Sequence, residues 1–214
     1  MRGVLKLSAV SVVTVAVMLF AGCSKSNTHP ANTESQEVAK PAGPPQIVTA
    51  KTAFWPMYTS ARKWAPDIVT LRLTAEEVPG FKNEDGKAAM WDATFASPSL
   101  HQYRDFTYAI ADVPPSVLKG VNGDQAQPWN GETRDAMAID LTLFNTDSDA
   151  AYKAAAADAD AWLKKNPTKT TTAFELGDTF KFQGPVWYIM WGDKKSGFVA
   201  YVDATTGAVR KTKK

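Results

Sequence analysis

Apolar positions in residues 47–112 first follow the spacing of a helix and then the alternation of strands. Pro56 is compatible with the first turn of that helix, and Pro66 ends it. The alternating segments that follow predict three antiparallel strands. The helix has the apolar face Phe54, Tyr58, Ala61 and Ala65, and the strands cover 68–73, 89–95 and 106–110, with a turn at 84–87.

Residues 147–214 repeat this order of elements. Asp147 and Asp149 can cap a helix over 148–165 and place acid at its positive end, and Asn166 and Pro167 end it. The second half therefore also predicts one helix followed by antiparallel strands. These strands cover 174–176 with 180–182, the run 186–191 that is apolar on both faces, and 198–202, before a turn at 203–207.

The segment between the halves is rich in Gly and Pro at first and then carries an apolar run over 136–144, which predicts one more strand. Trp91 in the first half corresponds by spacing to Trp187 in the second. The prediction is an α+β fold of two tandem helix-plus-antiparallel-sheet repeats. The repeats are 47–112 and 147–214, and 113–146 connects them.

The start of the chain has the order of an export signal. Arg2 and Lys6 precede an apolar run over 7–20, and small residues follow it. A membrane-spanning helix needs about 20 apolar residues, so the shorter run favours cleavage. A plain cleaved signal and a retained helix are the alternatives.

The end of this signal resembles the lipobox of bacterial lipoproteins. It reads Leu19-Phe20-Ala21-Gly22-Cys23, with Phe20 where Leu is usual. The resemblance implies a signal peptide over 1–22 and an acylated Cys23 as the first mature residue, anchored in a membrane of the cell envelope. The residue after the cysteine is Ser24 and not the Asp that would keep a lipoprotein from reaching the outer membrane. By resemblance to Gram-negative lipoproteins, it implies an outer-membrane location facing the periplasm.

Composition narrows the functional classes. Residues 23–46 combine the lipidated Cys23 with a polar, Pro-containing stretch that predicts a disordered tether. The net charge of +2 includes Arg2 and Lys6, so removing the signal leaves a nearly neutral chain with no footprint for nucleic acid. Cys23 is the only cysteine, so its acylation leaves no thiol for catalysis, a disulfide or a metal.

The C-terminal hairpin resembles the end of PepSY domains. The aromatic run 186–191 is followed by Val202-Asp203-Ala204-Thr205-Thr206-Gly207-Ala208-Val209, and PepSY domains close on such a strand and turn. The resemblance covers roughly 147–211, whereas 47–112 matches only in the order of its elements. It implies a cystatin-like helix-plus-sheet fold and a role in binding, and possible restraint, of a peptidase. The family has no catalytic motif to transfer.

Candidate reactive residues have structural explanations. His101 lies near Ser97 and Ser99, but the chain has no Gly-x-Ser-x-Gly elbow, which favours a polar loop histidine. Asn145, Asp147 and Asp149 have the spacing that begins a calcium loop, but Ala150 and Ala156 stand where Gly and an acid are needed, so helix capping is the prediction. No metal, cofactor or enzymatic activity is expected; a site built on paired carboxylates is the enzymatic alternative.

The aromatic residues provide the candidate binding site. Most of the seven Trp lie on predicted core faces, but Trp129 falls in a loop with little to bury it. Trp129, Tyr188 and Met190 are the predicted exposed binding patch. The expected function is a non-catalytic, lipid-anchored envelope protein that binds a protein partner, such as a peptidase or another envelope protein. The alternative is a lipoprotein that binds a small ligand, namely a glycan, lipid or peptide.

Overall fold

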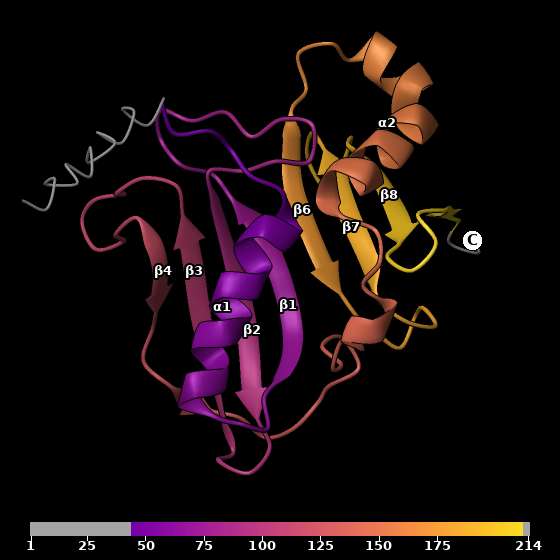
Figure 1. The fold of residues 1–214 in the computed structure, drawn as a ribbon. Helices are drawn as coiled ribbons and strands as arrows, with labels where there is room; N and C mark the ends of the chain where they lie inside the picture. Colours follow the sequence, from indigo (N-terminus) through magenta and orange to yellow (C-terminus); the bar gives the residue numbers. More distant parts are fainter. Residues whose placement is uncertain (1–43, 212–214) are drawn as a thin grey trace, which may run out of the picture. The chain divides into compact units, whose positions relative to one another are not determined.

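The computed structural model describes residues 44–211 (Figure 1). The predicted signal peptide, Cys23 and all but the end of the predicted tether lie outside the described residues. The described part is an α+β fold, which confirms the predicted class. It has two α-helices and one nine-stranded antiparallel sheet instead of a separate sheet for each predicted repeat. Within 44–211, neither helix combines the length and the apolar character that a bilayer crossing requires.

The two helices divide the order of the elements. Helix α1 (Ala50–Trp64) precedes the first strands, and α2 (Ser148–Lys165) follows the short 3-10 helix η1 (Leu141–Leu143). The strands are β1 (Val69–Glu76), β2 (Met90–Ser97), β3 (Gln102–Ala109), β4 (Gly120–Gly123), β5 (Gln127–Pro128), β6 (Thr171–Gly177), β7 (Val186–Trp191), β8 (Phe198–Asp203) and β9 (Val209–Arg210).

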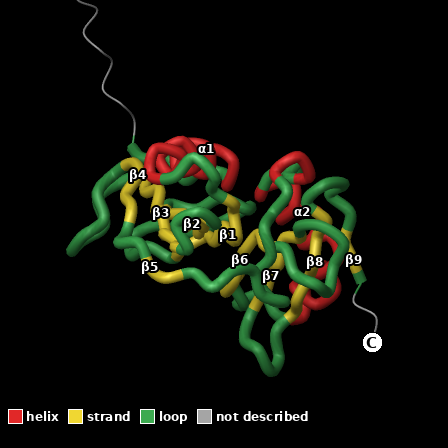
Figure 2. Tube along the Cα trace, turned by 90° about the horizontal axis from the view of Figure 1, so that it is seen from below, coloured by secondary structure: helices red, strands yellow, loops and turns green. Residues whose placement is uncertain are grey.

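The strands form a single sheet in the order β4-β3-β2-β1-β6-β7-β8-β9, with β5 also paired to β3. The strands that follow α1 and the strands that follow α2 therefore join where β1 pairs with β6. Figure 2 follows this order from β4 to β9, with α1 lying over the first strands. Helix α1 packs on β2 and β3, and α2 packs on β7 and β8.

Both helices bury the same face of the sheet. Leu73 of β1 faces Leu176 of β6 across the junction, and both side chains are buried in one core cluster that includes α1 and α2. Aromatic rings make this core continuous between the halves. Phe144 lies 5.7 Å from Phe54 and 5.9 Å from Trp187, measured between ring centroids.

Each half holds its helix with an equivalent tryptophan. The indole N–H of Trp91 donates to the carbonyl of Val48, two residues before α1, at 3.0 Å. The indole N–H of Trp187 donates to the carbonyl of Thr146, two residues before α2, also at 3.0 Å. Buried indole N–H groups need a hydrogen-bond partner, so each bond satisfies a Trp and orients a helix start.

The N-termini of the two helices meet in the core. Asp147 caps α2, and its Oδ1 accepts from the backbone N–H of both Ser148, at 2.7 Å, and Lys51 of α1, at 3.0 Å. The Ser148 hydroxyl accepts from the N–H of Ala50 at 2.8 Å. Two positive helix ends repel each other, and the Asp147 carboxylate offsets that repulsion. Capping by Asp147 confirms the sequence interpretation.

A tight turn fits against this junction. Residues 84–87 form the predicted turn, with Asp85 and Gly86 at positive φ. A Cβ on Gly86 would lie 2.3 Å from the carbonyl oxygen of Ser148, so the position admits no side chain. The glycine is therefore required both by its backbone conformation and by the approach of α2.

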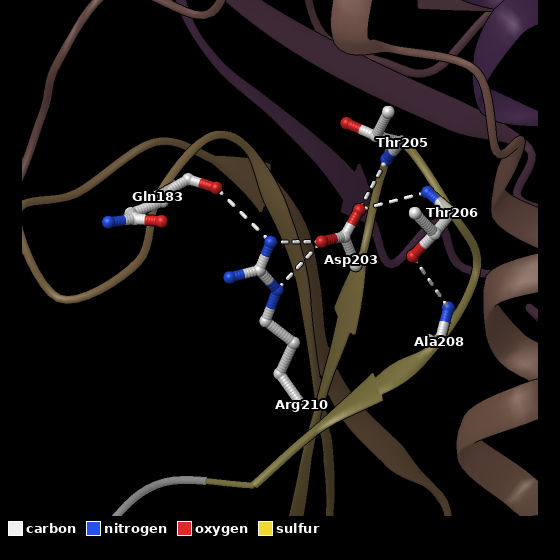
Figure 3. Close-up of polar contacts among 6 residues, drawn as sticks. All are labelled: Gln183, Asp203, Thr205, Thr206, Ala208 and Arg210. Atoms are coloured by element: carbon white, nitrogen blue, oxygen red, sulfur yellow. Dashed lines mark hydrogen bonds and ion pairs between the residues drawn. The ribbon is translucent and has the colours of Figure 1, made fainter.

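The C-terminal hairpin turns around Asp203 (Figure 3). The buried Asp203 carboxylate accepts from the backbone N–H groups of Thr205, at 2.8 Å, and Thr206, at 2.9 Å, and pairs with the Arg210 guanidinium. Burial acts to raise the pKa of Asp203, but the hydrogen bonds from Arg210, Thr206 and Thr205 together lower it. Gly207 takes the positive φ that closes the predicted turn.

Three local predictions are wrong. Pro56 lies inside α1 rather than in its first turn, because the helix begins at Ala50. Residues 180–182 form a turn instead of a strand. The run 136–144 makes only single bridges before η1: Met137 bonds to Asp178 and Ile139 to Thr70, in the opening beyond the last β1–β6 pair. This run fills the splay between two strands and does not extend the sheet. Strands β4 and β5 lie within the predicted connecting segment.

Candidate functional site: the open face of the sheet

The sheet face opposite the helices carries the candidate site. Among the described residues, neither helix packs on this open face, because both helices belong to the core that covers the opposite face of the sheet. Cross-strand pairing aligns its side chains into rows. The central row changes from polar to aromatic between β6 and β7. From β3 to β9 it reads Thr107, Asp92, Thr74, Glu175, Tyr188, Tyr201 and Arg210.

Three adjacent rings, tilted against one another, form what we call the aromatic strip, made of Phe182, Tyr201 and Tyr188. Ring centroids are 4.8 Å apart between Phe182 and Tyr201 and 5.6 Å apart between Tyr201 and Tyr188. All three side chains are half-buried, so part of each ring remains accessible. Burial raises the pKa of the Tyr188 hydroxyl, and Tyr201 and Glu175 add to this effect.

Met190 is not the exposed residue that the sequence analysis expects. Its side chain is only 8% exposed, although it points to the open face beside Tyr188. The Tyr188 hydroxyl donates to the Met190 sulfur at 3.3 Å. The cross-strand neighbours of Met190 on this face are Ala173 of β6 and Val199 of β8. Met190 is therefore a buried hydrogen-bond partner of Tyr188 and not an accessible residue of the open face.

A groove of about 490 Å³ lies beside the strip, and we refer to it simply as the groove. Strands β1, β2, β3 and β6 contribute to its lining, and Pro128 of β5, the loop that follows it to residue 136 and Thr179 form the rest. Trp129 is half-buried in this loop, whose position is fixed by the backbone N–H of Trp129 donating to the His101 carbonyl at 2.8 Å. The lining includes Arg72, Thr94, Tyr103, Asp105, Trp129, Asp135 and Glu175.

The groove carries more acid than base. Asp105, Asp135 and Glu175 line it together with the single cation Arg72. No ion pair among residues 44–211 involves Arg72, whose side chain is exposed. Burial raises the pKa of Glu175, and the positive charge of Arg72 reduces that rise. The Thr94 hydroxyl donates to Asp105 at 2.5 Å, which fixes this carboxylate on β3.

Desolvated acids continue from the groove along the central row. Burial raises the pKa of Asp92 and of Glu76, and the charge of Asp92 raises that of Glu76 further. Thr74 and Asp92 are cross-strand partners, and Thr74 Oγ1 and Asp92 Oδ1 are buried without a hydrogen-bond partner in the described part of the chain. Unpaired buried polar atoms are costly, so this surface differs from an ordinary solvated sheet.

The structure places His101 at an exposed turn, as predicted. His101 adopts positive φ between β2 and β3. The neighbouring serines bond to Asp67: the Ser97 hydroxyl donates at 2.7 Å and the Ser99 backbone N–H at 2.8 Å. These bonds lower the pKa of Asp67 to about 2, and the bond from Ser97 contributes most. Asp67 thereby secures the turn and leaves no serine–histidine hydrogen bond at this position.

Sequence reasoning finds Trp129 and Tyr188 but misses the groove between them. Arg72, Asp105 and Glu175 come from three strands and meet only through the sheet register. Their one sequence signal is a polar side chain at alternate strand positions, which is equally typical of any solvated sheet face. Sequence reasoning also omits Tyr201 and Phe182, which complete the aromatic strip.

Comparison with known proteins supports the fold and leaves the family open. No protein-family model matches the chain, and no curated protein matches it at a significant level. The crystal structure of a protein from Clostridium difficile 630, described as a "putative lipoprotein (CD1622)", is similar with a TM-score of 0.50 and 13% sequence identity. The match covers 78% of this chain and 94% of that chain. This likeness shows a shared α+β fold.

Proposed function

We propose that the chain is a non-catalytic, lipid-anchored protein of the cell envelope that binds a protein partner on the open face of its sheet. One observation carries the proposal: the face opposite the helices presents the aromatic strip next to the groove. Clustered accessible tyrosines and tryptophans are the side chains that dominate protein interfaces. The partner class we propose is a peptidase that the chain restrains.

The proposed anchor is Cys23, acylated after removal of residues 1–22. The sequence supports it through the lipobox resemblance, and a protein of similar fold is itself described as a "putative lipoprotein". Acyl chains contribute about 0.8 kcal/mol per buried methylene, and stable anchoring needs more than one chain. We place the protein on the outer membrane facing the periplasm in a Gram-negative cell, because Ser24 follows the cysteine.

We further propose that the two halves are tandem PepSY-like copies. Three observations support this idea: the shared order of helix and strands, the equivalent Trp91 and Trp187 bonds, and the register at the junction. The β1–β6 register is centred on the pair Leu73 and Leu176, which a two-fold rotation between the halves would exchange. Such a pair of copies doubles the area of open sheet face available to one partner.

Cross-linking in the native envelope tests the function. The intact protein is cross-linked in cells and its partners are identified by mass spectrometry, with Cys23→Ser to test the anchor. The open face is altered in Tyr188→Ala/Tyr201→Ala and, independently, in Val199→Glu, whose side chain is 39% exposed on the same face. Trp55→Ala is the matched control, because Trp55 is 47% exposed on α1.

The expected result is one partner that the wild type and the Trp55 variant recover and both open-face variants lose. If that partner is a peptidase, the purified protein should inhibit it. A partner that both open-face variants still recover would contradict the proposal. Equal thermal unfolding of the variants excludes loss of folding as the cause.

A small-ligand function is the second candidate, and the groove volume favours it. A volume of about 490 Å³ lies in the range of ligand sites, roughly 300–1,000 Å³. Trp129 in the lining gives such a ligand a flat aromatic surface. Titration with panels of glycans, lipids and peptides should shift the fluorescence of the wild type more than that of Trp129→Phe. A flat response across the panels would count against this function.

A further inference from the structure

The groove has an uneven charge that restricts what it can bind. Asp105, Asp135 and Glu175 oppose one cation, Arg72, among its lining side chains. An anionic ligand would meet three carboxylates for each guanidinium. Like charges placed together at an interface weaken binding and exclude wrong partners. The groove is therefore complementary to positive charge.

Aromatic rings line the same groove as the carboxylates. Trp129 enters from the loop and Tyr103 from β3. Indole and phenol faces attract cations through their quadrupole, and the attraction is stronger when the cation is desolvated. A carboxylate floor with aromatic walls recognises an ammonium or a guanidinium group better than an apolar side chain.

We propose that the groove receives a lysine or arginine side chain from an extended, basic segment of the protein partner. This inference rests on the proposed function, because the same open face carries the aromatic strip that the partner would cover. The cation lies between Glu175 and Asp105 and packs against Trp129. The rest of the segment crosses β6 toward Tyr188, the cross-strand neighbour of Glu175.

The state of the acids before binding favours this occupant. Burial raises the pKa of Glu175 in the groove lining, so its negative charge is poorly solvated in the free protein. A cation in the groove would stabilise the ionised form and replace lost water contacts. Arg72 weakens this attraction without cancelling it, since it is one positive charge near several acids.

Defined peptides test the inference directly. The probes are three fluorescein-labelled peptides of equal length in which serine alternates with lysine, glutamate or glutamine, and the intact protein in detergent binds them in a fluorescence-anisotropy titration. The lysine peptide should bind at least about tenfold more tightly than the glutamate peptide, a difference that weakens as salt rises from about 0.05 to about 0.5 M.

Isosteric variants locate the binding. Asp105→Asn/Glu175→Gln should weaken the lysine peptide by roughly tenfold, because it removes two of the groove carboxylates and keeps their shape. Asp158→Asn/Asp160→Asn is the matched control on α2, with the same change of net charge, and its affinity should stay within about twofold. Trp129→Leu should also weaken binding. Equal loss in the groove and control variants, or equal binding of the three peptides, would overturn the inference.

The outcomes separate this inference from the proposed function. If cross-linking returns a partner that depends on the aromatic strip while the lysine peptide fails to bind at about 1 mM, the function stands and the cationic groove is wrong. If the lysine peptide binds through the groove but no partner depends on the strip, the groove assignment stands and the protein-partner function is wrong.

Discussion

Single carboxylates hold two of the turns of this protein, one of them buried and the other exposed. Asp203 is nearly enclosed and accepts two backbone N–H groups as well as the Arg210 guanidinium. Asp193 makes the same kind of turn in the preceding hairpin, accepting from the N–H groups of Lys195 and Ser196 at 2.9 Å, but it is exposed to solvent. The two residues therefore separate the effect of burial from that of turn chemistry.

Asp203→Asn should destabilise the protein by about 1.5–3 kcal/mol, the usual contribution of hydrogen bonds to a buried charged group. Asp193→Asn is the control and should change the free energy of unfolding much less, because water competes for its bonds. Urea unfolding measures both. An equal effect of the two variants would show that burial does not matter at this turn.

The open-face acids should respond to pH with the opposite sign to Asp203. Burial raises the pKa of Asp92, so the folded state binds more protons than the unfolded chain, and stability falls as the pH rises from the ordinary aspartate pKa of 3.8 through the raised pKa. The pKa of Asp203 is lowered from 3.8, so its contribution to stability is fully present above pH 3.8. This contribution is lost as the pH falls through the folded pKa.

Asp92→Asn should therefore stabilise the protein at neutral pH, by less than about 2 kcal/mol, and should have little effect at pH values below the unfolded pKa. Unfolding measured in urea across pH gives this difference. Destabilisation at neutral pH would contradict the assigned direction of the pKa shift and would indicate that the Thr107 hydrogen bond to the Asp92 carboxylate outweighs the cost of its burial.

At the scale of elements, the helix junction is the strongest local constraint. Asp147 serves α2 as its cap and also accepts from Lys51 of α1. Asp147→Ala should cost about 1–2 kcal/mol, at the upper end for a cap, because both helix starts lose an acceptor. Asp149→Ala is the control, since the Asp149 side chain bonds only to Ala150 next to it, and it should cost less. Equal unfolding midpoints for the two variants would contradict a shared cap.

How far the sequence predicts these elements depends on the range of the interactions. Helix α2, β7 and the Asp203 turn follow from capping residues, periodicity and turn chemistry, all within a few neighbours. The strand predicted over 136–144 does not form, because the apolar residues of this segment fill the splay between β1 and β6. The local pattern does not encode that splay. The groove could not be predicted for the same reason, since Arg72 and Glu175 meet only through the β1–β6 register.

At the scale of the whole described structure, one sheet and one core join the halves. Phe144 lies between Phe54 of α1 and Trp187 of β7, and its side chain is buried. The halves also share the β1–β6 ladder and the Asp147 junction. Elements that bury a common core open together, so we expect residues 44–211 to unfold as one cooperative unit although each half has its own helix and strands.

Phe144→Ala tests this cooperativity. Removing a buried aromatic ring should cost about 3–5 kcal/mol, and because the ring contacts both halves, the loss should appear equally in each. Native-state hydrogen exchange measures the opening free energy of the backbone amides of β3 and β8, two strands that lie far apart in the sheet. Both should lose the same opening free energy in the variant. If β8 amides lose protection while those of β3 keep it, the halves are separate folding units, and a partner could then bind one half without stabilising the other.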